Sequence, residues 1–445
     1  MKKIYSHSKQ ILLKFNFKFK ISTFKLLIIF LFFLNFLSAQ EYSFDFEEFE
    51  KKPYEFIVNF KIQPDFTLLN KSSELYSLNF LNKEEKDYWD SYTASLELKG
   101  SYEFSKFKLS LDIIDQLSYT ANDEFENKFN IYEFFGNADF STNFSLQIGK
   151  KSVKWGKGYI WNPVSFVGRQ KDINDIDAGL EGFWVMKLDY VKSLSGILQN
   201  FSVTPVIVPV TKDINEDFQA GESVNFILHT YFLIKDTDLD FYLFMKDEKF
   251  KKIGFDIARN ILPSWEIHAE YAFEKDVITN WWNSDFVVES TASNTHDYLF
   301  GTRILFGSNT TLIVEYLHND AGLDIRQMKN FFDAVELAVS EDPDLLPTVK
   351  KYQGESFSAQ FLMRDYLYAK ISQPEPFDIL YFTASVFVLF NINDKSEMIG
   401  GEFNYSRFEN LNLKLKYSLL FGENNSEFGE KISSGKMSFL MEYVF

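Results

Sequence analysis

The sequence contains no cysteine, and this absence excludes several classes of protein at once. Disulfide scaffolds, zinc ribbons, thiol nucleophiles and iron–sulfur centres all require that residue. Positive charge is also scarce, since 46 Lys and Arg stand against 63 Asp and Glu and give a formal net charge of −17. A nucleic-acid binder neutralises phosphates with basic residues, so we expect no nucleic-acid partner.

Long apolar runs and catalytic motifs are missing as well. After residue 40 no apolar run reaches the ~18 residues of a membrane-spanning helix, which excludes a helical membrane protein. No HExxH, EF-hand, P-loop or GxSxG motif is present. A barrel hydrolase would need a serine beside a histidine such as His268. We therefore expect no enzyme, no catalytic residue, no cofactor and no metal site.

Aromatic residues, in contrast, are abundant, and they alternate with polar ones. Phe, Tyr and Trp make up 18% of the 445 residues. Between residues 92 and 102, Tyr92, Leu96 and Tyr102 share one face, and the intervening positions are polar. Residues 107–113, 265–274 and 411–418 alternate in the same way. A period of two is typical of β-strands with one apolar face.

Three features favour a membrane barrel over a soluble sandwich, which alternates too. Many segments run well beyond the ~5–6 residues of a soluble strand and match the ~9–11 residues of a tilted strand that crosses a bilayer. Their apolar faces end in Tyr, Trp or Phe, as the aromatic girdles of outer-membrane barrels do. Their polar faces carry both signs of charge, which suits a wet lumen. Only a closed barrel pairs every backbone group in lipid.

The predicted fold is therefore all-β, a closed antiparallel transmembrane β-barrel of about 18 strands. An even number is expected, and 16 strands would result if the first segment were not a strand. The predicted strands are 55–62, 92–104, 106–118, 127–140, 143–153, 182–191, 197–209, 223–234, 237–247, 249–259, 262–275, 295–307, 310–319, 357–371, 377–391, 396–408, 410–422 and 434–445.

The links between these strands differ in length. Short links such as Ser308-Asn309 and Glu409-Asn410 are predicted to be periplasmic turns. The long links 155–181, 276–294 and 320–356 are predicted to be extracellular loops or inward-folded elements. The 320–356 loop carries one short helix, 323–339, with Ile325, Met328, Phe332, Val335 and Val339 on one stripe. That helix is either a cap on the barrel rim, a gate in the pore or an exposed element.

Both ends of the chain carry recognisable signals. Residues 1–40 hold seven lysines and no acid, then the apolar run Leu26–Leu37, which predicts a cleaved signal peptide ending at Ala39 or Gln40. Removal of seven lysines leaves a net charge of −24. Residues 41–54 form an acidic segment, periplasmic or lumenal, and residues 55–445 form the barrel. The last strand ends in Phe445, and it resembles the C-terminal signal that the barrel-assembly machinery reads.

The most unusual stretch is 149–181, a glycine-rich segment dense in charge of both signs. We interpret it as a constriction, because opposed basic and acidic side chains inside a barrel select permeants by charge. Glycines let the backbone bend inward, and the tryptophans could stack on sugar rings. An inert loop or an external ligand site are the alternatives. The candidate binding residues are Lys150, Lys154, Trp155, Trp161, Arg169, Lys171, Asp172, Asp175 and Glu181.

The same stretch carries a family resemblance. A strand ending in Gly149-Lys150, then Trp155-Gly156, a glycine-rich turn and Asn162-Pro163, resembles alginate-export-type porins and related uncharacterised outer-membrane barrels. Residues 364–382 have a similar character. The family more usually has Arg-Gln after the strand glycine, where this chain has Lys150-Lys151. The resemblance implies a porin-like or export barrel.

These predictions converge on an outer-membrane protein of a Gram-negative bacterium, in contact with outer-membrane lipid. The expected function is a porin-like channel for passive passage of small hydrophilic solutes, including anionic or saccharide ones. Two alternatives remain open. One is a selective polysaccharide export pore, and the other is a non-conducting structural or adhesin barrel.

Overall fold

The computed structural model describes residues 52–445 except 121–123, 177 and 357–360. The predicted signal peptide and all of the acidic segment up to residue 51 therefore lie outside the described residues. The strands are β1 (Tyr54–Leu69), β2 (Tyr88–Phe104), β3 (Phe107–Tyr119), β4 (Phe125–Ser141), β5 (Phe144–Lys151), β6 (Phe183–Ser193), β7 (Leu198–Val210), β8 (Ser223–Ile234), β9 (Thr237–Lys246), β10 (Lys249–Leu262), β11 (Trp265–Trp282), β12 (Val288–Leu305), β13 (Thr311–His318), β14 (Asp365–Pro374), β15 (Phe382–Asn391), β16 (Glu397–Phe408), β17 (Leu411–Phe421) and β18 (Ser433–Val444). The helices are α3 (Glu74–Phe80), α4 (Ile325–Ser340) and α5 (Leu346–Ser356), with short 3-10 turns at η2 (Pro343–Leu345) and η3 (Pro376–Asp378).

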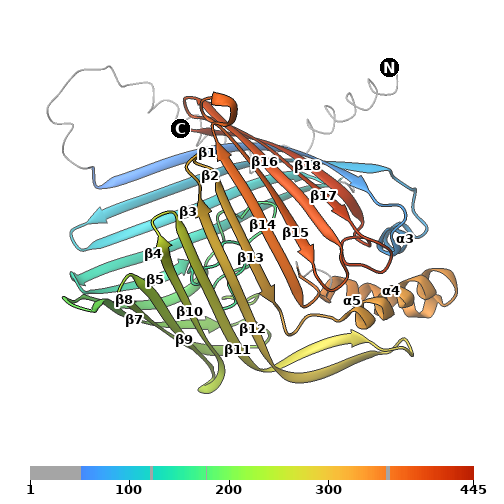
Figure 1. Cartoon of the computed structure of the whole chain (residues 1–445), viewed down its shortest axis with the longest axis horizontal. Helices are drawn as coiled ribbons and strands as arrows, with labels where there is room; N and C mark the ends of the chain where they lie inside the picture. The colour runs from blue at the N-terminus through green and yellow to red at the C-terminus, as the bar shows by residue number, and fades with distance from the viewer. Residues whose placement is uncertain (1–51, 121–123, 177, 357–360) are drawn as a thin grey trace. The chain divides into compact units, whose positions relative to one another are not determined.

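The strands form one closed sheet in which each strand pairs antiparallel with its neighbours in the chain (Figure 1). β1 closes the ring, because it pairs with β2 on one side and with β18 on the other, as in the registers Ile62↔Ala94 and Ile62↔Met441. The prediction of a closed antiparallel barrel is confirmed. β1 is a full strand of 16 residues, so the barrel has 18 strands rather than 16.

The two ends of the barrel differ. We call the end with the last strand's terminus the turn end, because most of its links are short, as at Ser105-Lys106 and Glu409-Asn410. We call the other the loop end, because it carries the long links 70–87, 152–182, 319–364 and 422–432. Because consecutive strands are antiparallel, every second link lies at the same end of the barrel.

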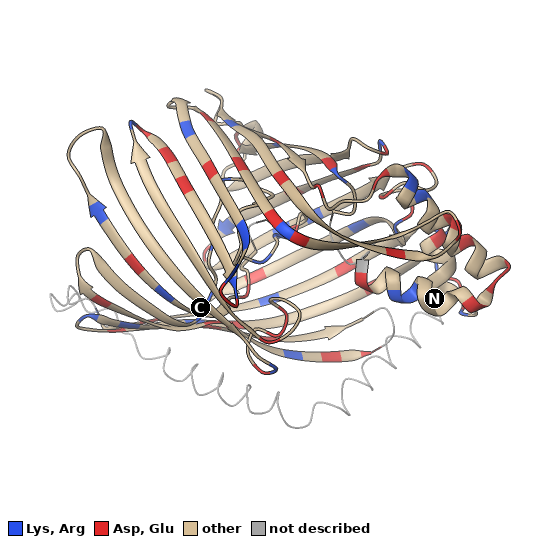
Figure 2. Cartoon of the chain, turned by 90° about the horizontal axis from the view of Figure 1, so that it is seen from below, with Lys and Arg blue, Asp and Glu red and all other residues tan. Residues whose placement is uncertain are grey.

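The alternation predicted from the sequence sorts side chains between two faces. On β2, Tyr92 and Tyr102 are exposed on the outer face, whereas Glu97 is buried on the inner face. Lys61 on β1 and Lys99 on β2 both bind Glu97, at 2.9 and 2.7 Å between nitrogen and oxygen. Lysines and acids are interspersed along the strands rather than gathered on separate sides (Figure 2).

Several boundaries differ from the prediction. β15, predicted to begin at 377, begins at Phe382, because residues 377–381 form a turn. The predicted loop 276–294 is mostly a continuation of β11 and β12, which pair out to Trp282↔Val288 and form a long hairpin. A register shift between Glu274 and Val277 breaks the alternation there, which hides the strand in the sequence. β14 begins at Asp365 rather than at 357. Leu362 and Met363 are apolar because they pack into the core of the loop end, not because they face lipid.

The predicted helix is α4, and it packs against the β11–β12 hairpin and α5 at the loop end (Figure 1). Asp324 caps it and forms a capping box with Gln327. Met328, Phe332 and Val335 are buried as predicted, but Ile325 is 57% exposed. Among the described residues, no helix combines the length and apolar character needed to cross a membrane.

Candidate functional site

The link between β5 and β6, residues 152–182, folds into the barrel, and we call it the lumen loop. Its contacts show its path, since they lie on the inner faces of strands far from β5 and β6. Residues 157–164 bind side chains of β9, β10, β11 and β13, and Asp175 forms an ion pair with Lys416 of β17. The lumen loop therefore spans the lumen from one wall to the opposite one.

Two buried carboxylates hold the loop by its backbone. Glu270 on β11 accepts hydrogen bonds from the N–H groups of Lys157, Gly158 and Val164, at 2.6, 2.7 and 3.3 Å. Glu315 on β13 accepts from the N–H groups of Tyr159 and Ile160. Hydrogen bonds to a charged acceptor are worth about 1.5–3 kcal/mol each. A buried carboxylate is tolerated when its oxygens are satisfied in this way.

His268 on β11 reaches one of these anchors, Glu315, across a strand. Its Nε2 lies 3.0 Å from Glu315 Oε1 on β13, so the ring passes over β12. Gly301 on β12 makes room for it, because a Cβ at Gly301 would lie 2.0 Å from Nε2. The other ring nitrogen, Nδ1, lies 3.5 Å from Glu266. Both nitrogens of His268 thus face carboxylates rather than the serine that a barrel hydrolase would need.

Lys157 anchors the loop through its side chain as well. Its ammonium lies 2.7 Å from Asp240 on β9 and 3.7 Å from Asp256 on β10. Burial lowers the pKa of this ammonium, but the facing carboxylates of Asp256 and Asp240 outweigh burial and raise it. Lys157 therefore remains charged, and its ammonium faces two acids that stand directly opposite each other in the sheet.

Apolar side chains complete the attachment on both sides. Val164 and Phe166 pack with Val206, Ile227 and Phe244 on the inner faces of β7, β8 and β9. Trp161 packs against the other wall, with its ring centroid 6.2 Å from that of Tyr368 and 5.4 Å from that of Phe361. Trp161 is only 5% exposed, so its ring is unavailable for stacking on a permeating sugar.

The predicted binding residues do not form two opposed rings of charge. Lys150 pairs with Glu181, and its register partner Phe134 is exposed on the outer face, so the Lys150 side chain leaves the sheet on that face. Arg169 binds Asp217 of the neighbouring loop at 2.6 Å. Lys171 donates to the carbonyls of Gly158 and Tyr159 and closes a turn of the lumen loop.

The remaining predicted residues have other surroundings. Trp155 is half-buried beside His229 and Tyr242, with ring centroids at 5.3 and 5.6 Å. Lys154 is exposed and has no ion-pair partner among the described residues. Asp172 is also exposed and accepts from the Asn174 N–H. Asp175 reaches the wall at Lys416.

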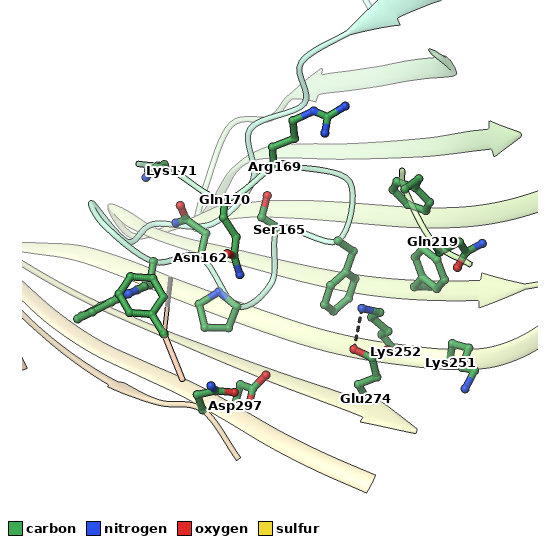
Figure 3. Close-up of a pocket in the computed structure, with 18 of the residues that line it drawn as sticks. Asn162, Ser165, Arg169, Gln170, Lys171, Gln219, Lys251, Lys252, Glu274 and Asp297 are labelled. Carbon is green, nitrogen blue, oxygen red and sulfur yellow. Dashed lines mark ion pairs between the residues drawn. The ribbon is translucent and has the colours of Figure 1, made fainter. Parts of the chain in front are cut away.

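Two cavities lie beside the lumen loop. The first, about 1050 Å³, is bounded by loop residues 160–171 and the inner faces of β9–β13 (Figure 3). Its basic lining residues outnumber the acidic ones: Arg169, Lys171, Lys246, Lys251 and Lys252 against Asp217, Glu274 and Asp297. The second, about 270 Å³, separates residues 172–176 and 178 of the loop from β14–β18. Lys370, which lines it, has no hydrogen-bond or ion-pair partner among the described residues.

The alternation of residues 265–274 puts Glu270 on the polar face, but it does not predict that Glu270 anchors the loop. Alternation of apolar and polar residues predicts on which face of the sheet a side chain lies, but not which residue it contacts. For Lys150 the alternation of the strand already predicts the face. Phe144, Leu146 and Ile148 lie on the outer face, and the two-residue period of a β-strand places Lys150 on the same face.

Comparison with known proteins shows likeness in fold alone. No family model and no curated protein matches the chain. Among solved structures, OccK11 (OpdR) of Pseudomonas aeruginosa has a TM-score of 0.51 at 9% identity, over 89% of this chain and 98% of that one. OccK2 (OpdF) of the same organism, solved in complex with glucuronate, has a TM-score of 0.50 at 11% identity, over 88% and 98%. The P. aeruginosa outer membrane protein OpdK has a TM-score of 0.50 at 10% identity, over 88% and 99%.

Proposed function

We propose that the chain is an outer-membrane channel of a Gram-negative bacterium that lets small hydrophilic solutes cross passively. The turn end faces the periplasm and the loop end faces the outside, as the lengths of the links suggest. The closed 18-stranded ring with an apolar outer face supports a place in lipid. The fold shared with OpdK, itself an outer membrane protein, supports the same location.

One observation carries the proposal more than any other. The lumen loop is fixed across the barrel by Glu270 and Glu315, and cavities lined by charged side chains remain beside it. A loop that only closed the wall would have no need of anchors on the opposite side. A loop held across the lumen narrows the aqueous path and brings polar groups close to anything that passes.

The lining favours anionic solutes over cationic ones. The first cavity has an excess of basic residues in a chain of net charge −17, and Lys370 in the second has no acidic partner in the described part of the chain. OccK2 (OpdF) binds glucuronate in its solved complex. We extend this solute class, small organic acids and acidic sugars, to the present chain. The predicted constriction is retained with Arg169, Lys171 and Asp175, and without Lys150 and Glu181.

The ends of the chain fit the same route to the membrane. Residues 1–40 would direct export and be removed, as proposed from the sequence. Phe445 follows β18, and its N–H donates to Val58 O at 2.8 Å, which joins the last residue to the first strand. We propose that the barrel-assembly machinery recognises β18 through this terminal strand.

Swelling of proteoliposomes tests the proposal. Vesicles that contain the purified barrel should swell in isotonic solutions of glucuronate, glucose and glycine, and swell fastest with the anion after correction for size. Vesicles without protein, and vesicles with heat-denatured protein, should not swell. If the folded protein gave no swelling with any of these solutes, the channel proposal would be wrong, and a non-conducting barrel would replace it.

A further inference from the structure

The link between β14 and β15 stands out at the turn end. It comprises residues 375–381, which we call the apolar turn, and it is the longest link there. Phe377 is 93% exposed, Leu380 61% and Tyr381 54%. Exposed apolar side chains scattered singly are ordinary, but several within one convex turn mark a contact surface.

The backbone of the apolar turn is held in an unfavourable conformation. Glu375, Phe377, Asp378 and Tyr381 all have positive φ, between 48° and 64°. Residues with a Cβ rarely adopt this region, and glycine usually occupies it. Strain of this kind persists where the surroundings impose it, and it clusters at functional sites. Here its effect is to turn large apolar side chains outward.

The turn is nevertheless ordered by its own hydrogen bonds. The Glu375 N–H donates to Phe382 O at 2.6 Å, and the Tyr381 N–H donates to the Glu375 carboxylate at 3.2 Å. The Ser406 N–H of β16 donates to Tyr381 O at 3.1 Å, which ties the turn to the neighbouring strand. The apolar side chains are therefore presented on a rigid support.

Two observations identify what covers them. The outer face of the strands that enter and leave the turn is apolar, with Ile371 and Val386 paired and both exposed, and the turn continues that face. Two phenylalanines are also exposed at the same end of the barrel, Phe306 in the link after β12 and Phe408 at the end of β16. A protruding apolar turn can be accommodated by lipid, and aromatic residues concentrate at the interface between membrane and water.

We propose that the apolar turn inserts into the headgroup and acyl boundary of the lipid leaflet at the turn end and anchors the barrel there. The insertion rests on the proposed function, since it requires that the barrel spans the membrane. Phe377, Leu380 and Tyr381 enter the boundary, and the carboxylates of Glu375 and Asp378 stay at headgroup level. Burial of these side chains offsets the strain of the turn.

Spin labels test the anchor, and the absence of cysteine makes single-site labelling clean. Phe377→Cys and Leu380→Cys are labelled separately, so that most of the turn stays intact in each variant. Val386→Cys reports the lipid-facing strand, and Glu409→Cys reports a polar two-residue turn at the same end. Accessibility of each label to oxygen, which concentrates in lipid, and to a nickel chelate, which stays in water, is measured in phosphatidylcholine vesicles.

The labels at 377 and 380 are expected to be more accessible to oxygen than to the nickel chelate. Their ratio of oxygen to nickel accessibility should lie between the ratios measured at 386 and at 409. Equal values at 377, 380 and 409 would overturn the anchor and leave the channel intact, and a periplasmic partner would then be the occupant. Low accessibility to both reagents would overturn it in favour of contact with a second copy. A label at 386 open to nickel would overturn the proposed function itself.

Discussion

The carboxylate of Glu270 accepts the backbone N–H of Lys157, a residue 113 positions earlier in the chain, at 2.6 Å. The same oxygen also accepts from Gly158, so one side chain of the wall holds consecutive peptide groups of the lumen loop. Glu270→Gln replaces one oxygen by an NH₂ group, which faces the Val164 N–H as a second donor. Each buried donor left without a partner costs about 1–3 kcal/mol.

The variant should therefore loosen the loop and raise single-channel conductance about two-fold or more, with added current noise. Glu402→Gln is the matched control, because Glu402 also faces the lumen but forms its ion pair with Lys416 of β17, at 3.8 Å, rather than with the backbone of the lumen loop. Conductance is expected to stay near the wild-type value in that control. Equal conductance in both variants would show that Glu270 does not restrain the loop.

Gly301 should be intolerant of any side chain. A Cβ there would collide with the His268 ring, which could then no longer reach Glu315. Gly301→Val should lower the melting temperature in detergent by several degrees, because a buried charged pair loses its geometry. Gly307→Val is the control, since a Cβ at Gly307 meets nothing within 4 Å. Similar melting temperatures in the two variants would contradict this account.

Lys370 should influence which ions pass. It faces the second cavity without a partner among the described residues, so its charge acts directly on permeating ions. Lys370→Glu is expected to shift the reversal potential in a salt gradient toward cation selectivity. Lys192→Glu makes the same change of charge on the outer face, where Lys192 pairs with Phe201, and should leave the reversal potential unchanged. A shift of equal size in both variants would exclude a local effect.

The loop end should respond to pH through Glu427, which is fully buried in the link 422–432. Burial raises the pKa of this carboxyl, while the charge of Lys431 and hydrogen bonds from Tyr366 and Leu362 oppose the rise. A raised pKa means that the folded state favours the protonated form. The stabilisation is therefore fully present below the ordinary pKa of 4.5 and is lost as pH rises through the raised value.

Glu427→Gln should remove this dependence. The melting temperature of the wild type minus that of the variant should fall between pH 4 and pH 8. Glu423→Gln is the matched control, because it makes the same substitution at an exposed carboxyl in the same link. A flat difference for Glu427→Gln would show that its carboxyl does not titrate with folding.

Much of the barrel is predictable from the sequence, because lipid and water impose opposite demands on alternate residues. Tyr92 and Leu96 face one solvent and Glu97 the other, and this contrast recurs in almost every strand. The alternation disappears where both faces of a strand lie in the same solvent. Between the register shift at Glu274 and the tip of the β11–β12 hairpin, polar residues lie on both faces, and the period of two disappears.

The site is less predictable, because it depends on contacts that no local pattern records. Charge density and glycines pointed to the lumen loop, and alternation pointed to the inner face for Glu270. No sequence pattern links Lys157 to Glu270, because the two residues meet only when the barrel folds around the loop. Trp161 and Tyr368, which pack together, lie even farther apart in the chain, so a tryptophan expected to meet solutes is a core residue instead.

The central claim is that water passes beside the lumen loop. Recording single channels of the purified protein in a planar lipid bilayer tests it most directly. We predict discrete conductance steps in the wild type and larger steps in Glu270→Gln. A folded, inserted wild-type barrel that carries no current, together with a silent Glu270→Gln variant, would contradict the claim.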